Sequence, residues 1–204
     1  MRSATASPSD LTARATLREA ALSLFAARGY AATPVRDIAA AAGVSPALLF
    51  HHYGTKEGLR EAVDDWLVAT VAEAVAGGAS DAGGADALTE RFRRFAAVGA
   101  DHPAVSDYVA RILGEGGDAA RDLFDRMVAT TRAELAGLEA RGIVRPTDDE
   151  VGRALLLLFL ELGPMLLRAQ VERHMGAGLF EDASVDRWVS ACTSLLADGV
   201  LVSP

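Results

Sequence analysis

Apolar residues recur along most of this chain at the spacing of a helix rather than with the alternation of a strand. Between residues 11 and 28, Leu17, Ala21, Leu24 and Phe25 follow one another at helical intervals, which places them on one face of a helix. Alanine, leucine, arginine and glutamate dominate and runs of β-branched residues are absent, a composition that favours helix. The pattern predicts an all-α fold.

Glycine, proline and serine divide the chain into predicted helices. Thr33 and Ser45 each stand before a proline, and a side-chain N-cap followed by proline at the first helical position is a typical helix start. Pro164, after Gly163, lacks a backbone donor, so we expect it to free the carbonyl of Leu160 and to kink its helix. The predicted helices cover residues 11–28, 33–42, 45–52, 56–76, 85–100, 103–113, 117–141, 147–173 and 184–201.

Two of these helices, 33–42 and 45–52, are short and are joined by a tight turn. Gly43 can take positive φ in the turn, and Ala39 is small where the two backbones come closest. Leu49 fills the space between the helices. The segment is predicted to form a helical hairpin.

The second helix of the hairpin has a defined outward face. Successive residues turn by about 100°, so that with Leu49 facing inward Ala47 and His51 point outward, and Leu48 and Phe50 flank them. His52 is expected to point to the side. Such a face is what a recognition helix places in the major groove of DNA.

Charge is distributed unevenly along the chain. The net charge is −8, yet residues 1–60 carry +3 and the remaining residues carry −11. A basic head on an acidic body suggests that only the head contacts a polyanion. The alternative is chance clustering of charges on solvated faces.

Several other classes of protein lack support in the sequence. Cys192 is the only cysteine, so neither a disulfide framework nor a multi-cysteine metal site is predicted. The adjacent His51 and His52 have no histidine at i+3 or i+4 to complete a metal site. We expect no metal and no cofactor. We also expect no enzyme activity, because a phosphate loop, an H-E-x-x-H motif and a nucleophile next to a base are all missing.

The sequence favours a cytoplasmic protein. The N-terminal stretch MRSATASPSD has no apolar segment that could serve as a signal peptide. The longest apolar run, residues 154–171, is interrupted by Glu161, Pro164 and Arg168, whereas a membrane span needs about 20 nearly uninterrupted apolar residues. We therefore expect a buried helix and no membrane partner.

The stretch RATLREAALSLFAARGYAATPVRDIAAAAGVSPALLFHHYGTKEGLREAV, residues 14–63, resembles the N-terminal DNA-binding domain of the tetracycline-repressor (TetR) family. The resemblance implies a three-helix domain with a helix-turn-helix, followed by a helical body that binds small effectors and dimerises through its last two long helices. On this basis we expect a disordered tail at 1–9, a DNA-binding domain at 10–56 and an effector-binding and dimerisation domain at 57–204.

The resemblance also implies contacts between this domain and DNA. Phosphate contacts are expected from the starts of the short helices and from the turn after them, and base contacts from the outward face. Phe50 replaces the tyrosine that the family usually has, so direct base readout is expected to depend on His51, Arg36 and apolar contacts to thymine methyl groups. The alternative role of Arg36 is an ion pair with Asp37 or Glu57. The expected DNA-contacting residues are Thr33, Arg36, Ser45, Pro46, Ala47, Leu48, Phe50, His51, His52, Tyr53 and Lys56.

The body offers candidates for an effector cavity. Aromatic, methionine and hydroxyl side chains with one charge suit an apolar cavity that has a few polar anchors, and ordinary core packing is the alternative for each of them. The acidic body suggests a cationic effector, although solvated acidic faces account for it equally. The candidates are Trp66, Phe95, Tyr108, Arg111, Phe124, Met127, Thr131 and Phe159.

The last two long helices carry more apolar surface than one helix face needs, which indicates burial against a second copy as well as the home core. The alternative is that a single core absorbs all of it. The predicted dimer residues are Leu155, Leu162, Leu166, Val185, Trp188, Val189, Cys192 and Leu196.

These predictions describe a ligand-responsive DNA-binding regulator. We expect a homodimeric repressor that a small-molecule effector releases from a palindromic double-stranded operator. The alternatives are a helical interaction scaffold and an all-α enzyme, neither of which binds duplex DNA.

Overall fold

The computed structural model describes residues 8–76 and 85–197, and in these ranges every regular element is an α-helix. The predicted all-α fold is confirmed. The tail at 1–7, the glycine-rich stretch 77–84 and residues 198–201 of the last predicted helix lie outside the described residues. The helices are α1 (Pro8–Arg28), α2 (Val35–Ala41), α3 (Pro46–Tyr53), α4 (Lys56–Ala76), α5 (Ala85–Asp101), α6 (Pro103–Glu115), α7 (Gly117–Ala140), α8 (Glu150–Leu166), α9 (Arg168–Met175) and α10 (Asp182–Ala197).

Of the two predicted N-caps, Ser45 and Thr33, only Ser45 caps its helix in the structure. Ser45 caps α3 as predicted, because its Oγ accepts a hydrogen bond from the Leu48 backbone nitrogen at 3.3 Å and Pro46 follows at the first helical position. The predicted cap at Thr33 is wrong. The N-cap of α2 is Pro34, and the hydroxyl of the fully buried Thr33 donates instead to the carbonyl of Gly29 at 2.7 Å. Thr33 therefore holds the end of α1 against the start of α2.

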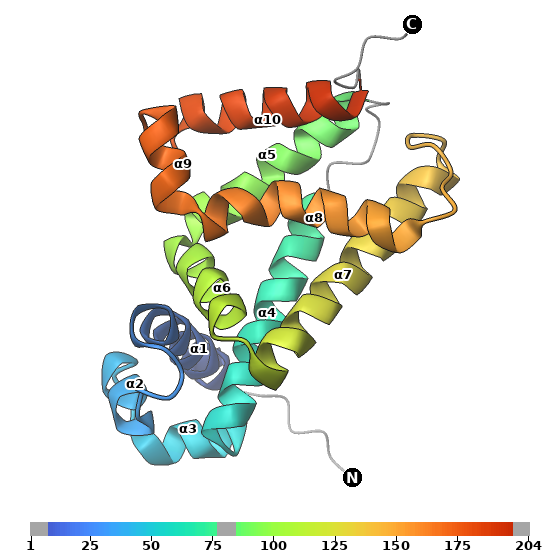
Figure 1. Cartoon of the computed structure of the whole chain (residues 1–204). Helices are drawn as coiled ribbons and strands as arrows, with labels where there is room; N and C mark the ends of the chain where they lie inside the picture. The colour runs from blue at the N-terminus through green and yellow to red at the C-terminus, as the bar shows by residue number, and fades with distance from the viewer. Residues whose placement is uncertain (1–7, 77–84, 198–204) are drawn as a thin grey trace, which may run out of the picture.

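The first three helices form a small head at one end of the molecule (Figure 1). Helix α1 packs against α6 and α4, and α4 continues from the head into the body, where it contacts α5 and α7. At the opposite end α10 lies against α5. Helix α8 crosses the middle of the body, where it packs against α7 and α6. The head thus rests on helices of the body.

One buried apolar cluster extends from the head into the body. It includes Ile38 and Leu49 of the hairpin, Leu59 and Val63 of α4, and Tyr108 of α6. Protein interiors are close-packed, so that displacement of one packed helix is felt by its neighbours. A shift of α4 or α6 would therefore be transmitted to the head.

The single helix predicted over 147–173 is two helices. Helix α8 ends at Leu166 and α9 begins at Arg168, with a bend of 82° between them. The bend follows Pro164, whose missing N–H leaves the carbonyl of Leu160 without a helical partner. The kink predicted at this proline is therefore confirmed, and it separates two helices.

Among the described residues no single helix is long and apolar enough to cross a membrane. Helices α8 and α9 reach the necessary length and composition only when counted together across their bend.

Candidate functional site

The hairpin of α2 and α3 is held rigidly by its buried side. Ile38, Ala39 and Leu49 are buried, and the turn closes with a hydrogen bond from the Val44 backbone nitrogen to the Ala39 carbonyl at 2.9 Å. Gly43 in this turn has φ +68°, a conformation that side chains other than glycine rarely adopt. The orientation of α3 relative to α2 is therefore fixed by packing and by the turn.

The opposite face of α3 is open to solvent. Ala47, Phe50 and His51 are exposed, and Leu48 and His52 are half-buried. The outward face predicted from the helical angle is confirmed. Phe50, with 48% of its surface exposed, gives this face a large apolar group that has no hydrogen-bond donor.

Arg36 stands at the start of α2 with its side chain 83% exposed. Its Nε lies 3.4 Å from Asp37 Oδ1, and Asp37 Oδ2 also accepts a hydrogen bond from Arg28 Nη1 at 3.1 Å. The ion pair considered as an alternative for Arg36 is thus present. Exposed pairs of this kind stabilise a fold by only about 0–1 kcal/mol, so little opposes an exchange of Asp37 for another anion.

The turn after α3 is tied to α1. The Tyr53 hydroxyl donates to the carbonyl of Arg14 at 2.7 Å, and Lys56 Nζ donates to the carbonyl of Tyr30 at 2.5 Å and lies 4.0 Å from the centre of the Tyr30 ring. Burial lowers the pKa of Lys56, and the charge of Glu57 opposes that effect. Both side chains therefore have structural roles in the head, although an ammonium group retains two further donors.

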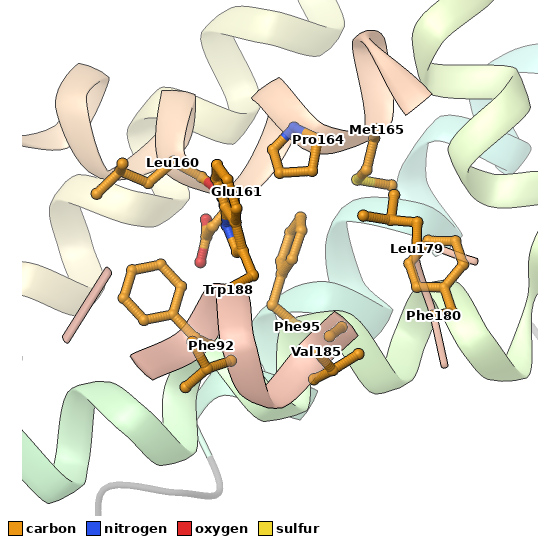
Figure 2. Close-up of a pocket in the computed structure, with 12 residues that line it drawn as sticks. Phe92, Phe95, Leu160, Glu161, Pro164, Met165, Leu179, Phe180, Val185 and Trp188 are labelled. Atoms are coloured by element: carbon orange, nitrogen blue, oxygen red, sulfur yellow. The ribbon is translucent and has the colours of Figure 1, made fainter. Parts of the chain in front are cut away.

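The body contains a small apolar cavity between α5, α8 and α10, shown in Figure 2, with a volume of about 40 Å³. Its walls include Phe92, Phe95, Pro164 and Trp188. The carbonyl of Leu160 on this wall accepts a hydrogen bond from Trp188 Nε1 at 3.1 Å. The group freed by Pro164 is therefore satisfied from α10.

A second cavity of about 20 Å³ lies between α4, α5, α7 and α8. Phe95 and Glu161 line both cavities and so form the wall between them. Three charged side chains line the second cavity: Arg91, Glu134 and Glu161. Sequence reasoning did not select them as site residues, and Glu161 is noted there only as one of the residues that interrupt the longest apolar run.

The structure brings together only part of the predicted effector site. Phe95, Met127 and Thr131 line the second cavity. Phe159 is 57% exposed on the outer face of α8 and lines neither cavity. A helical pattern identifies a side chain as apolar, but the packing of α8 against α7 and α6 decides which way that side chain points.

The other predicted cavity residues support the junction between head and body. The guanidinium carbon of Arg18 lies over the ring of Trp66, 5.0 Å from the ring centre. Phe124 is half-buried and packs against the large apolar cluster. Arg111 donates from Nε to the carbonyl of Ala26 at 2.8 Å and from Nη2 to that of Ala27 at 3.3 Å. These carbonyls belong to the last turn of α1, so that Arg111 ties α6 to the head.

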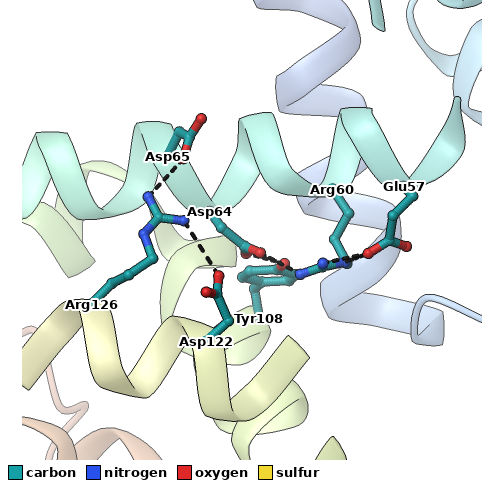
Figure 3. Close-up of polar contacts among 7 residues, drawn as sticks. All are labelled: Glu57, Arg60, Asp64, Asp65, Tyr108, Asp122 and Arg126. Carbon is teal, nitrogen blue, oxygen red and sulfur yellow. Dashed lines mark hydrogen bonds and ion pairs between the residues drawn. The ribbon is translucent and has the colours of Figure 1, made fainter. Parts of the chain in front are cut away.

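Tyr108, also a predicted cavity residue, belongs to a polar network between α4, α6 and α7 (Figure 3). Its hydroxyl donates to Asp64 Oδ1 at 2.5 Å, and Arg60 Nη1 lies 2.5 Å from Asp64 Oδ2 and also pairs with Glu57. Burial raises the pKa of Asp64 to about 6, against the opposing effects of the Tyr108 hydrogen bond and of Arg60. Burial and the neighbouring Asp64 raise the pKa of Tyr108 well above its usual value.

The predicted dimer residues fall into two groups. Leu162, Val189 and Cys192 are buried inside the chain, and Val185 and Trp188 line the first cavity. Leu162, Val189 and Cys192 therefore have almost no surface left for a second copy, whereas Val185 and Trp188 are half-buried and keep part of their surface open.

The remaining predicted dimer residues lie on an open apolar face. Leu155 is half-buried, whereas Leu166 and Leu196 are exposed. Sequence reasoning missed other members of this face on α8 and α10, because helical spacing alone does not show which apolar face the home core leaves open. The exposed large apolar residues of the two helices and of the bend are Val151, Leu156, Phe159, Leu166, Leu167, Leu195 and Leu196.

The histidine pair has no metal-binding environment. The rings of His51 and His52 lie 5.2 Å apart at their centres. Over residues 8–76 and 85–197, no group of three or more histidine, cysteine, aspartate or glutamate side chains could hold a metal ion.

Two family models match the sequence. One, described as bacterial regulatory proteins of the tetR family, matches residues 17–63. The other, described as a tetracyclin repressor-like C-terminal domain, matches residues 101–201. The first match covers the hairpin and its supporting helices, and the second covers most of the body.

Curated relatives show the same relationship. The HTH-type transcriptional regulatory protein RaaS of Mycobacterium tuberculosis is 36% identical over 165 residues, which are 81% of this chain and 75% of RaaS. The HTH-type transcriptional repressor KstR2 of Rhodococcus jostii is 40% identical over 100 residues, which are 47% of this chain and 48% of KstR2.

Solved structures share the fold at low sequence identity. FadR from Bacillus subtilis, solved in complex with stearoyl-CoA, has a TM-score of 0.69 at 12% identity, with 92% of this chain and 99% of FadR covered. AibR, solved in complex with isovaleryl coenzyme A and operator DNA, has a TM-score of 0.62 at 20% identity, with 91% of this chain and 98% of AibR covered.

Proposed function

The chain belongs to the tetR family of bacterial regulatory proteins, and from that premise we propose that it is a ligand-responsive transcriptional repressor of the cytoplasm. It binds a double-stranded operator through its head and releases it when a small molecule occupies its body. The relatives named as transcriptional repressors support this function. We assign residues 10–56 to DNA binding and residues 57–204 to effector binding and dimerisation.

The observation that carries the proposal is the open face of α3. The buried Leu49 and the turn at Gly43 fix this helix on α2, and its exposed face consists of Ala47, Phe50 and His51. A short, rigidly mounted helix of this kind fits the major groove. The head that carries it is the basic part of an otherwise acidic chain.

Within this face we assign different contacts to different residues. His51 reads a base edge, and Phe50 and Ala47 contact thymine methyl groups. Arg36 reaches a base edge or a phosphate, since its pair with Asp37 is exposed. Around them Ser45, Pro46, Leu48, His52, Tyr53 and Lys56 complete the contact surface. Thr33 is left out, because it is fully buried and its hydroxyl is already bonded to Gly29.

The repressor acts as a homodimer. The exposed apolar residues of α8 and α10, among them Leu156, Phe159 and Leu195, supply the contact between copies, since several large apolar side chains that the core of their own chain leaves exposed mark an interaction site. Two recognition helices then enter successive major grooves about 34–36 Å apart on a palindromic operator.

Effector binding changes that spacing through the junction of head and body. Arg111 joins α6 to the last turn of α1, and α4 runs from the hairpin to the wall of the second cavity, where it contributes Leu67 and Val75. An effector that favours a shifted α4 or α6 therefore moves the head. The two states differ in the distance between half-sites.

Selection of binding sites from random duplex DNA, followed by fluorescence anisotropy at several salt concentrations, tests this function. We expect a palindromic motif and an affinity that falls steeply with salt. His51→Ala is expected to relax the preference at one or two positions of the motif. His174→Ala, which alters an exposed histidine on α9, is the matched control and should leave the motif unchanged. An interaction scaffold predicts no salt-dependent binding to any duplex, and that result would overturn the proposal.

A further inference from the structure

The polar group in the second cavity points to the chemistry of the effector. We propose that the effector is an amphipathic organic cation whose protonated amine binds Glu134 and Glu161. The inference rests on the proposed function in one respect, namely that the body is where an effector binds.

The second cavity contains more carboxylates than cationic groups among the described residues. Arg91 Nε donates to Glu134 Oε1 at 2.8 Å, while Arg91 Nη1 and Nη2 face the two oxygens of Glu161, the latter at 3.4 Å. The Arg91 and Glu161 side chains are only 4% and 1% exposed, and the Glu134 side chain is 15% exposed. One guanidinium group thus faces two carboxylates, and no other charged side chain among the described residues lines this cavity.

An excess of one negative charge in such a place is costly. Buried charges in proteins are paired, because the interior solvates an isolated ion poorly. A ligand with a single positive charge would complete the pairing. The free energy of that pairing becomes available only when the ligand is bound, so it can drive a change between two states.

The hydrogen bonding of Glu134 is incomplete within the described part of the chain. Glu134 Oε2 is buried and has no hydrogen-bond partner among the described residues. Its other oxygen is bonded to Arg91. A carboxylate oxygen only accepts hydrogen bonds, so the missing partner is a donor, and a protonated amine offers both the donor and the charge.

The size and the walls of the second cavity also suit an amine that carries an apolar tail. A cavity of about 20 Å³ is close to the space that one water molecule occupies, roughly 10–15 Å³, and an ammonium group is similar in size. The remaining walls, among them Leu67, Val71 and Met127, are apolar. Phe95 and Glu161 also line the apolar cavity of about 40 Å³, so that an amine bound to Glu161 lies next to further apolar walls that suit its tail.

An anionic ligand fits the same cavity poorly. The nitrogen donors of Arg91 already face carboxylates. An anion would have to displace Glu134 or Glu161 and leave that carboxylate without its partner, which is unfavourable for a group removed from water. The coenzyme A thioesters held by FadR and AibR therefore belong to a different class from the ligand proposed for this chain.

Isothermal titration calorimetry of the full-length chain with three ligands of equal tail length tests the inference. The probes are octylammonium, octanol and octanoate. We expect octylammonium to bind about tenfold or more tightly than the other two, since a charged hydrogen bond contributes about 1.5–3 kcal/mol. Equal binding of octanol, or tighter binding of octanoate, would overturn the proposal.

A variant locates the binding. Glu134→Gln keeps an oxygen for Arg91 but removes the charge, and it should abolish the preference for octylammonium. Glu150→Gln, which alters an exposed carboxylate on α8, should preserve the preference and so excludes general attraction to an acidic protein. An unchanged preference in Glu134→Gln would contradict the assignment. The comparison of the three ligands on the unmodified chain remains decisive if Glu134→Gln fails to fold.

Operator release is measured separately, by anisotropy of labelled DNA in the presence of octylammonium. Calorimetric binding by a chain that binds no duplex would leave the cation site standing and overturn the repressor function. Operator binding by a chain that does not bind octylammonium would do the reverse.

Discussion

The indole nitrogen of Trp188 donates a hydrogen bond to the carbonyl oxygen of Leu160 at 3.1 Å. Leu160 lacks a partner within α8 because Pro164, four residues later, has no N–H to offer. Trp188 comes from α10, so the bond joins the last described helix to α8 about one turn before Pro164. It also fixes the indole ring as a wall of the apolar cavity (Figure 2).

Trp188→Phe should therefore destabilise the fold. The carbonyl of Leu160 would lose its donor while staying half-buried, and we expect the free energy of unfolding to fall by about 1–3 kcal/mol. In a Pro164→Ala background the alanine N–H can bond to Leu160, so that the same change at Trp188 should cost less. Urea unfolding followed by circular dichroism measures all four proteins of the cycle. Equal costs in both backgrounds would show that the bond to Leu160 is not the cause.

Arg36→Ala should weaken operator binding with little effect on folding. The side chain is exposed and its pair with Asp37 is weak, so the melting temperature should hardly change. If Arg36 neutralises a phosphate, the slope of log affinity against log salt falls by about one. Arg121→Ala removes a comparable exposed pair, with Asp118 on α7, and serves as the control. Loss of affinity at an unchanged slope would instead indicate a contact with a base edge.

Asp64 should make stability depend on pH. Burial raises its pKa from 3.8 to about 6 in the folded chain, so the folded state binds the proton more tightly than the unfolded state. This contribution is fully present below pH 3.8 and is lost as the pH rises through about 6. One pKa unit corresponds to about 1.4 kcal/mol, so the stability of the wild type relative to Asp64→Asn should fall by at most ~3 kcal/mol across this range.

Unfolding in urea at several pH values between 4 and 7 measures that difference. Asp65→Asn is the matched control, because Asp65 is the exposed neighbour whose Oδ1 pairs with Arg126 at 2.7 Å (Figure 3). A wild type and an Asp64→Asn variant that respond to pH in parallel would refute the role of Asp64.

The open apolar face predicts the oligomeric state. Leu156 and Phe159 are 67% and 57% exposed and lie three residues apart on α8, so that they share one side of the helix. Replacing both with glutamate should convert the proposed dimer to a monomer. The new carboxylates of one copy would be buried opposite those of the second copy across the two-fold axis, and like charges repel. Light scattering after size exclusion should give a native mass near that of one chain, against twice that mass for the wild type. Ala133→Glu, at an exposed position of α7, should remain dimeric, and a dimeric double variant would place the interface elsewhere.

The helices and the hairpin could be predicted from the sequence because their causes are local. Ser45 caps α3 and is followed by Pro46, and Gly43 supplies the positive φ of the turn. Once Leu49 is placed inward, the helical angle determines that Ala47 and His51 face outward. The break near Pro164 follows from a single missing N–H group.

Contacts between distant segments decided the rest. The sequence shows that α8 and α10 are apolar. Only their packing shows that Leu162 and Cys192 are buried within their own chain and that Phe159 is exposed. Likewise, helical spacing cannot bring Arg91 of α5 to Glu161 of α8, 70 residues away. The sequence by itself thus determined most of the helices and the outward face of α3, because neighbouring residues specify them, whereas the tertiary structure decided the cavity, its charge and the open face, because these arise where separate helices meet.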